Sequence, residues 1–156
     1  MSYWDTFTLS KLYLPEADSP AFAQHAAGAT INVTAKLALL EMRQVAFRKE
    51  SDALIPPNTA EVVLSQLERD IAAGQIRVVD MDAQTEAEFK AIMARCYRHT
   101  SPIPIHTLDA IQLASARVAG ETELVATDKR MRDAAKLLGL TRAKFRVLAR
   151  LAADHQ

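Results

Sequence analysis

Residues 106–132 of the chain read HTLDAIQLASARVAGETELVATDKRMR, and this stretch indicates the fold class of the whole sequence. Apolar residues recur at helical spacing between a suitable N-cap at Thr107 and a stop at Gly120. The apolar run 124–126 then predicts a buried strand, and helix-forming residues follow it. A strand between two helices is typical of an α/β domain. The helical stripe consists of Leu108, Ile111, Ala114 and Val118.

Two carboxylates lie at the junctions of these predicted elements. Asp109 falls in the first turn of the helix, and Asp128 follows the carboxyl end of the strand. In open α/β sheets, ligands bind outside that end of the strands. A structural role explains each acid equally well, because acids cap helix N-termini and complement the helix dipole. A functional interpretation therefore needs further acids.

Length and composition predict one globular domain. The chain has 156 residues, of which 49% are hydrophobic and 24% charged, so it can bury a sizeable core. We expect the domain to span residues 1–148, with a C-terminal tail at 149–156. No apolar run approaches the roughly 20 residues needed to cross a bilayer, and the N-terminus lacks a signal-peptide pattern, which predicts a cytoplasmic protein. The single cysteine, Cys96, excludes an intrachain disulfide and is expected in the core.

Charge is distributed unevenly along the chain although the net charge is zero. Residues 1–128 carry 11 basic and 17 acidic side chains, whereas residues 129–156 carry 8 basic and 2 acidic ones. This asymmetry is compatible with a phosphate-binding face beside an acidic site. A solvated helix followed by a charged tail explains the same pattern.

Strand and helix patterns alternate along the rest of the chain. Helices are predicted between the strands, for example over residues 35–49 and 83–97. This alternation implies a single α/β domain with a parallel central sheet of about five short strands and helices on both faces. The predicted strands comprise residues 2–4, 30–33, 76–79, 124–126 and 145–148.

Two more acids lie where a site would form. Asp5 follows the first predicted strand, as Asp128 follows the fourth. Glu41 lies on the inward-facing stripe of the helix over residues 35–49. Burying an unpaired carboxylate is expensive, so Glu41 needs a cation, a proton or a cleft that holds a metal. Arg48, two turns further along the same face, is an alternative partner for it.

The acids would repel one another if the fold gathered them at one edge of the sheet. Their assembly is tolerable only with protons or a hard cation, and oxygen ligands without Cys or His suit Mg²⁺ or Mn²⁺. Such a site performs phosphoryl chemistry. Asp80 and Asp82 follow the third strand and resemble another acidic pair, but a helix cap explains them, and we leave them out of the site.

The order and spacing of these motifs resemble those of PIN-domain ribonucleases, of the kind that act as the toxin in bacterial VapBC toxin–antitoxin pairs. The resemblance covers nearly the whole chain, and Glu41 matches the family's helix acid. The other matching segments are Asp5-Thr6 with KLYLPE at residues 11–16, TLDAIQLASA at 107–116, and DKRM at 128–131 with Ala134-Ala135 and Gly139-Leu140.

This resemblance implies a metal-dependent endoribonuclease that hydrolyses RNA phosphodiester bonds with Mg²⁺ or Mn²⁺ and leaves a 5′-phosphate. Asp5, Asp109 and Asp128 would ligate the metal directly or through water. Glu41 would hold a ligand water or assist deprotonation, which makes all four acids catalytic. Basic residues after the last acid would hold RNA backbone phosphates or be exposed helix charges: Lys129, Arg130 and Arg132.

Two positions depart from the family pattern, and both concern hydroxyl residues near the acids. The family often has a small hydroxyl residue two positions after the first acid and another two positions before the last, where this chain has Phe7 and Ala126. Thr6 and Thr127 are adjacent and are the candidates to orient ligands instead. Without such hydroxyls, metal binding or catalysis would weaken by roughly 10- to 100-fold.

The resemblance also implies protein partners. A cognate antitoxin would lay an apolar segment over the early helices, and we expect an apolar face with Leu9, Leu12 and Phe22 to receive it. A homodimer is expected, and a membrane partner is not.

His106, in a proline-rich loop, is expected to form a local hydrogen bond or to contact a phosphate.

Three other classes of protein compete with this interpretation. A phosphatase of the haloacid dehalogenase type needs a second Asp where Phe7 stands, and a response-regulator receiver needs an acidic neighbour that Asp5 lacks before Glu16. The serious alternative is a PIN module that binds RNA or a protein partner without catalysis. Metal-dependent cleavage of RNA separates that module from the enzyme.

Overall fold

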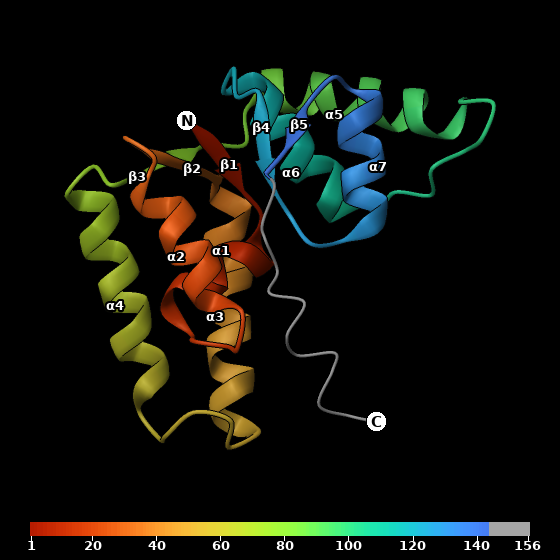
Figure 1. Ribbon diagram of the computed structural model, residues 1–156. Coiled ribbons are helices and arrows are strands. Elements are labelled where there is room, and N and C mark those ends of the chain that lie inside the picture. The colour runs from red at the N-terminus through yellow and green to blue at the C-terminus, as the bar shows by residue number, and fades with distance from the viewer. Residues whose placement is uncertain (144–156) are drawn as a thin grey trace, which may run out of the picture.

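The computed structural model describes residues 1–143, in which five parallel strands form one sheet. The strand order is β3-β2-β1-β4-β5, so β1 lies in the centre (Figure 1). Trp4 of β1 pairs with Val125 of β4, and Tyr3 pairs with Val33 of β2. This confirms the predicted α/β class and the parallel sheet. The strands are β1 Ser2–Trp4, β2 Asn32–Ala35, β3 Ile76–Val79, β4 Glu123–Val125 and β5 Thr141–Arg142.

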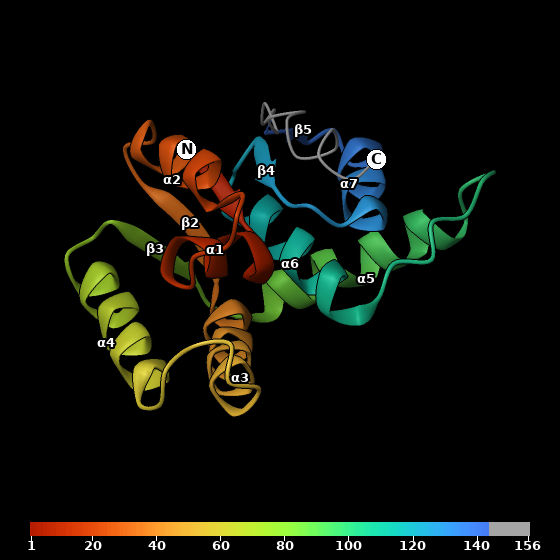
Figure 2. The same cartoon turned by 60° about the horizontal axis from the view of Figure 1, so that its bottom comes forward.

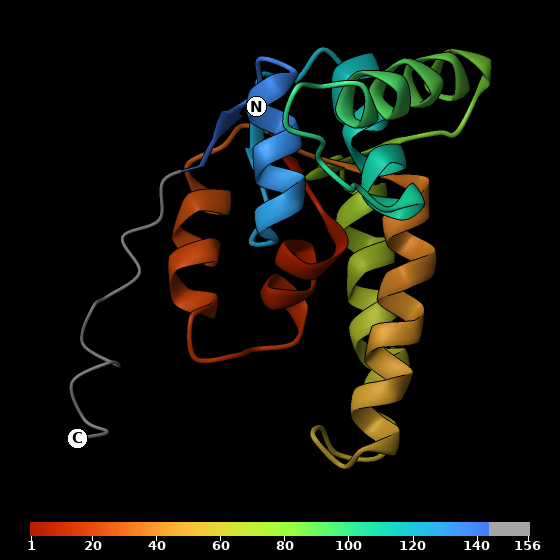
Figure 3. The same ribbon diagram turned by 90° about the vertical axis from the view of Figure 1, so that its right-hand side faces the viewer.

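Helices cover both faces of the sheet, as the alternating pattern predicts. Helices α3 and α4 lie side by side (Figures 1 and 3), whereas α5 and α6 pack together at the other side of the molecule (Figure 2). The helices are α1 Thr6–Tyr13, α2 Ser19–Ala27, α3 Lys36–Ser51, α4 Thr59–Ala72, α5 Ala83–Tyr97, α6 Thr107–Val118 and α7 Lys129–Leu137.

The core is divided by the sheet into two clusters, because successive side chains of a strand point to opposite faces. Tyr3 packs with residues of α5, α6 and α7, whereas Trp4 packs with residues of α1 to α4. Both side chains are fully buried. The same alternation sends Leu124 to the first cluster and Val125 to the second. The short central strands are thus buried on both faces.

The predicted element boundaries agree closely with the structure in the middle of the chain. Strand β3 and helix α5 have the predicted bounds, and β1 does too. The N-cap of α6 is His106, so the predicted cap at Thr107 is off by one residue. The predicted strand at 145–148 lies outside the described residues, and β5 is found earlier at Thr141–Arg142. Its two residues are exposed and carry no apolar pattern.

Two expectations about apolar side chains are wrong. Leu9 and Phe22 are buried in the core, so they do not form a surface that receives a partner segment. Leu108, which belongs to the apolar stripe predicted for α6, is 48% exposed and does not lie in the core. The expectation for Cys96 is confirmed, since its side chain is buried in the first cluster. Among the described helices, none is long and apolar enough to cross a membrane.

The connectivity of the sheet places a switch point between β1 and β4. The chain proceeds from β1 to β2 and β3 on one side, then returns to β4 and β5 on the other. Ligands of open α/β sheets bind outside the carboxyl ends of the strands at such a point. Asp5 follows β1 and Asp128 lies three residues after β4, so the topology brings these acids to one edge.

Candidate active site

Asp5 connects β1, β4 and the start of α1. Its backbone N–H donates to the carbonyl of Val125, at 3.2 Å, which continues the pairing of the two strands. Its side chain is the N-cap of α1 and accepts from the backbone N–H of Thr8, at 2.8 Å. The Thr8 hydroxyl lies 2.6 Å from the same carboxylate oxygen and 2.8 Å from the Val125 carbonyl. The orientation of Asp5 is therefore fixed from two strands and a helix.

The pKa of Asp5 is raised by its surroundings. The residue is only 4% exposed, and burial raises the pKa of its carboxyl to about 6. The hydrogen bonds from Thr8 act in the opposite direction, and the negative charges of Asp109 and Glu41 add to the increase. These two acids thus lie close enough to Asp5 to affect it electrostatically.

Glu41 is held by donors from two other helices. The Thr6 hydroxyl donates to Oε2 of Glu41, and the side-chain amide of Gln112 lies 3.0 Å from the same oxygen. Gln112 Nε2 also donates to the Thr6 hydroxyl oxygen at 2.9 Å. The carbonyl oxygen of Gln112 accepts from the Tyr3 hydroxyl. These bonds direct the amide nitrogen of Gln112 toward Glu41.

The hydrogen bonds that run from Tyr3 through Gln112 to Glu41 have a fixed direction from donor to acceptor. Burial raises the pKa of Tyr3 well above its ordinary value, and the charge of Asp5 adds to this, so the phenol stays neutral and can donate. Gln112 is 3% exposed and Thr6 is 5% exposed. Arg48 was the alternative partner of Glu41, but within residues 1–143 no ion pair joins them.

Gln112 and Thr8 are site residues that the sequence did not identify. Gln112 lies three positions after Asp109, among the buried residues of α6, and its polar side chain interrupts an apolar helix. A buried glutamine needs partners, which was the available signal. Thr8 carries a hydroxyl one position beyond the departure at Phe7.

Asp109 and Asp128 form the other side of the edge. Asp109 lies in the first turn of α6, and its pKa is raised by burial and by the charge of Asp128. The charges of His106 and Arg130 lower the pKa of Asp109, and the negative charge of Glu41 raises it further. Asp128 is the N-cap of α7 and accepts from the backbone N–H of Met131 at 2.9 Å. The electrostatic effects connect all four acids.

The hydroxyl residues divide into one that contacts an acid and one that does not. Thr6 donates a hydrogen bond to Glu41, one of the candidate acids. Thr127 is exposed, and in the described part of the chain it forms no hydrogen bond with an acid. Phe7 is 66% exposed, and Ala126 is 8% exposed. The hydroxyls near the first acid therefore come from positions on either side of Phe7.

The basic residues after Asp128 differ in their surroundings. Lys129 is exposed and pairs with Asp133 at 2.6 Å, one helical turn further along α7. Arg130 lies 2.7 Å from His106, so the local hydrogen bond expected for His106 is present. Arg132 is half-buried, and its Nε has no partner within residues 1–143. Of these three residues, Lys129 and Arg130 are exposed at the surface.

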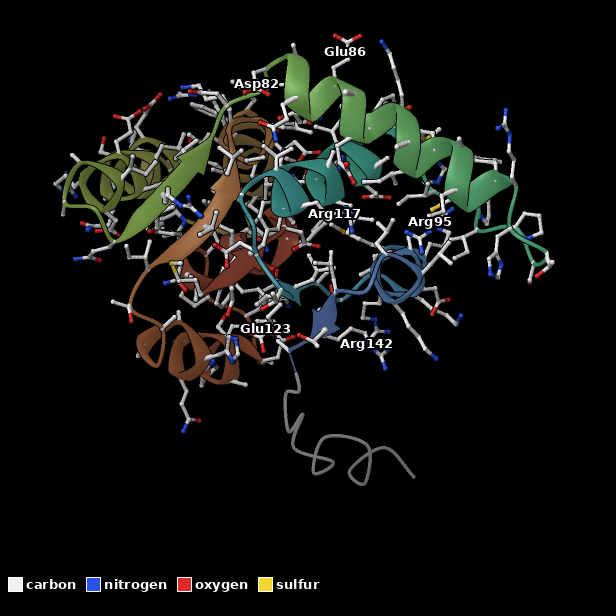
Figure 4. All side chains as sticks on the ribbon, turned by 90° about the horizontal axis from the view of Figure 1, so that it is seen from above. Asp82, Glu86, Arg95, Arg117, Glu123 and Arg142 are labelled. Atoms are coloured by element: carbon white, nitrogen blue, oxygen red, sulfur yellow. The ribbon has the colours of Figure 1, made fainter. Side chains whose placement is uncertain are left out.

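The acids that were left out of the site lie elsewhere. Asp82 caps α5 through the backbone N–H of Thr85 at 2.9 Å, which is the structural role expected for it. Figure 4 shows Asp82 and Glu86 at the start of α5, on the opposite side of that view from Glu123 and Arg142. Asp80 is exposed at the end of β3.

The family model of the PIN domain matches residues 3–137, nearly the whole described part of the chain. The chain belongs to the PIN-domain family. PIN domains are typically nucleases and generally bind a divalent metal. No curated protein sequence matches this chain.

Solved structures show the same fold at low sequence identity. FitAcB from Neisseria gonorrhoeae has 18% identity and a TM-score of 0.68, with 92% of this chain and 97% of that chain covered. VapBC2 from Rickettsia felis, bound to a DNA fragment from its promoter, has 13% identity and a TM-score of 0.64, with coverage of 93% and 99%. VapC20 from Mycobacterium tuberculosis, described as a toxin that cleaves the Sarcin-Ricin loop, has 18% identity and a TM-score of 0.65, with coverage of 86% and 95%.

The donor set of this PIN domain fits a hard divalent cation. The acids at the edge offer only carboxylate oxygens, which Mg²⁺ and Mn²⁺ prefer. Burial raises the pKa values of Asp5 and Asp109, and the charges of neighbouring acids raise them further, so a cation would relieve a repulsion between these acids. Within residues 1–143, no three acidic, histidine or cysteine side chains are arranged closely enough to hold a metal as they stand.

Proposed function

We propose that this PIN domain is a metal-dependent endoribonuclease and the toxin of a type II toxin–antitoxin pair. The observation that carries the proposal is the electrostatic connection among Asp5, Glu41, Asp109 and Asp128 at the switch point of the sheet. Like charges held close together are costly, and a fold that gathers one buried and three half-buried acids at a ligand-binding edge supports a function for them.

Asp5, Asp109 and Asp128 would hold Mg²⁺ or Mn²⁺. The metal would offset negative charge on the phosphate and make a bound water more acidic. Glu41 has one oxygen fixed by Thr6 and Gln112, which leaves the second oxygen to accept a proton or to orient the attacking water. Hydrolysis would leave a 5′-phosphate. Thr8 keeps Asp5 in place, and Lys129 and Arg130 would contact RNA phosphates beside the site.

The proposed partner is an antitoxin protein. Two structural neighbours, FitAB with 18% identity and VapBC2, have been crystallised together with their antitoxin partners and a DNA fragment. These complexes support an equivalent antitoxin partner for this chain. Its docking surface would not include Leu9 and Phe22, because both are buried. A homodimer remains a prediction. A PIN module that binds RNA or protein without cleaving RNA is the second candidate, favoured by the exposed Phe7 where the family has a hydroxyl.

Cleavage of mixed RNA tests the proposal. Wild type should cleave with Mg²⁺ or Mn²⁺ and stop in excess EDTA, and Asp109→Asn should reduce the rate by at least 100-fold, roughly the effect of losing a metal ligand. Asp80→Asn is the matched control, because Asp80 is an exposed acid outside the site. Cleavage that persists in EDTA, or that survives Asp109→Asn as well as Asp80→Asn, contradicts the assignment.

A further inference from the structure

A pocket of about 370 Å³ adjoins the acids, between α1 and α3. Thr6 and Glu41 are part of its lining, so a molecule in this pocket would touch residues of the proposed active site. The remaining lining comes from α1, α3 and the segments that follow them. It consists of Phe7, Ser10, Glu16, Gln44, Val45, Arg48, Lys49, Asp52 and Leu54.

The apolar part of the lining is unusually exposed. Phe7 is 66% exposed, two positions after Asp5, and Leu54 is 69% exposed. Neither side chain is needed to fill the core, since both lie outside the two buried clusters. An exposed aromatic ring beside a polar site offers a flat face for stacking. Phe7 is therefore available to a ligand.

The charges of the pocket nearly cancel apart from Glu41. Glu16 pairs with Lys49 at 2.9 Å and with Lys11 at 2.7 Å. Arg48 and Asp52 carry opposite charges, and in the described part of the chain Arg48 has no ion pair. A phosphate gains little in such a pocket, because its two cations face three carboxylates. A neutral, planar group that can form hydrogen bonds fits better.

The size of the pocket limits its occupant. Small-molecule sites start at about 300 Å³, so this pocket accommodates one nucleobase with part of its sugar. A helix, which is about 10–12 Å wide with its side chains, requires a longer groove. Unpaired bases of RNA are bound by stacking on aromatic rings and by hydrogen bonds to their edges.

We propose that this pocket binds one unpaired nucleobase of the RNA substrate, next to the phosphodiester that is cleaved. Phe7 stacks on the base, and Gln44 and Arg48 form hydrogen bonds with its edge. This inference rests on the proposed ribonuclease function and specifies which residues of this chain would contact a base of the substrate. A paired base cannot enter the pocket unless it leaves the duplex, which costs free energy.

Binding of short RNA in EDTA tests the pocket without cleavage. The probe is a single-stranded RNA of mixed sequence, with the same strand annealed to its complement for comparison. Phe7→Ala should raise the Kd of the single strand by about 10-fold or more, the usual effect of losing one stacked base, and Phe7→Trp should not. The Kd of the duplex should stay the same for all variants. Phe47→Ala is the matched control, since Phe47 is an exposed phenylalanine that does not line the pocket.

An abasic scan identifies the base concerned. Replacing single nucleotides of the RNA by abasic ones should weaken wild-type binding at one position beside the cleavage site. Phe7→Ala should remove that penalty, because the stacking partner is already absent. Equal Kd values for Phe7→Ala and Phe47→Ala would overturn the assignment and leave the pocket to a polypeptide partner. If wild type neither binds nor cleaves RNA, the proposed function fails as well, so the two failures are distinguishable.

Discussion

The two halves of the acidic edge differ in how their carboxylates are held. On the side of α1 and α3, Asp5 and Glu41 accept hydrogen bonds from Thr8, Thr6 and Gln112. On the side of α6 and α7, Asp128 accepts one helix-capping bond, and Asp109 forms no hydrogen bond or ion pair with a described residue.

This difference indicates which half is organised before a ligand arrives. Asp5 and Glu41 keep their positions through side chains that are themselves buried. Asp109 is influenced by Asp128, His106 and Arg130 only through charge. A bound cation would therefore move mainly the carboxylates of Asp109 and Asp128, because hydrogen bonds already fix the positions of Asp5 and Glu41.

The largest expected effect concerns the charge of Asp5. Its pKa of about 6 lies above the ordinary value near 4, so the folded protein binds more protons than the unfolded chain between these values. The stabilising effect of the proton is complete below pH about 4 and is lost as the pH rises through 6. Asp5→Asn should raise the free energy of unfolding in EDTA at pH 7 by up to about 3 kcal/mol relative to wild type. Urea melts at pH 4 and pH 7 measure this difference.

A comparison with metal completes this test. Excess Mn²⁺ should raise the melting temperature of wild type more than that of Asp5→Asn or Asp128→Asn, since each variant lacks a proposed ligand. Asp80→Asn should show the wild-type increment. Equal increments in wild type and both site variants would mean that Asp5 and Asp128 do not belong to one metal site.

The next largest effect is expected from removing the hydrogen bonds that hold Glu41 while all four acids are kept. Gln112→Met keeps the shape of the side chain but removes both donors, and Thr6→Val removes the hydroxyl that contacts Glu41. We expect each to lower kcat/KM by about 10- to 100-fold, the usual effect of changing a residue that orients a metal-site group. Thr6→Ser should retain most activity. Initial rates over a range of RNA and Mn²⁺ concentrations measure these changes.

A second buried hydroxyl provides a control that distinguishes an effect on the position of Glu41 from an effect on stability. Thr34 is fully buried and donates to the Trp4 carbonyl at 2.8 Å, so Thr34→Val removes a comparable bond that does not involve Glu41. Both valine variants should lose similar stability, about 1–3 kcal/mol. If Thr34→Val loses as much activity as Thr6→Val, the hydrogen-bond chain supports the fold and does not position Glu41.

The smallest effect concerns the two exposed cations after Asp128. Lys129→Gln with Arg130→Gln should weaken RNA binding several-fold and reduce the magnitude of the slope of log K against log salt by about 1.5 to 2. Arg132 is kept, because its Nε is buried. Arg95→Gln with Arg98→Gln, two exposed changes at the far end of α5, is the control. An unchanged slope would make Lys129 and Arg130 ordinary surface charges.

The sequence predicted the sheet and the acids better than the contacts between them. Apolar runs and helix caps place β1, β3 and α5 correctly, because these signals are local. Strand β5 has no such signal, since pairing with β4 is what makes its two exposed residues a strand. Leu108 follows the helical period but is exposed. It lies in the first turn of α6, next to two other exposed residues, His106 and Thr107.

Local pattern also fails for the partners of Glu41. Its inward position follows from helical spacing, yet the donors come from α1 and α6, at distances along the chain that no motif encodes. Arg48 is near in sequence and lines the same pocket, but Glu41 bonds to Thr6 and Gln112. The positions of the acids in sequence predict the edge on which they lie, whereas the bonds that hold them depend on tertiary packing.

The shared contact at Val125 has a consequence for synthesis of the protein. The Val125 carbonyl receives the backbone N–H of Asp5 and lies 2.8 Å from the Thr8 hydroxyl, a residue 117 positions earlier in the chain. A ribosome completes both β1 and α3 long before it makes β4, and domains fold as units once their segments are available. Asp5 therefore lacks its final support until β4 pairs with β1. The proposed nuclease activity would start only once β4 has been made and has paired with β1.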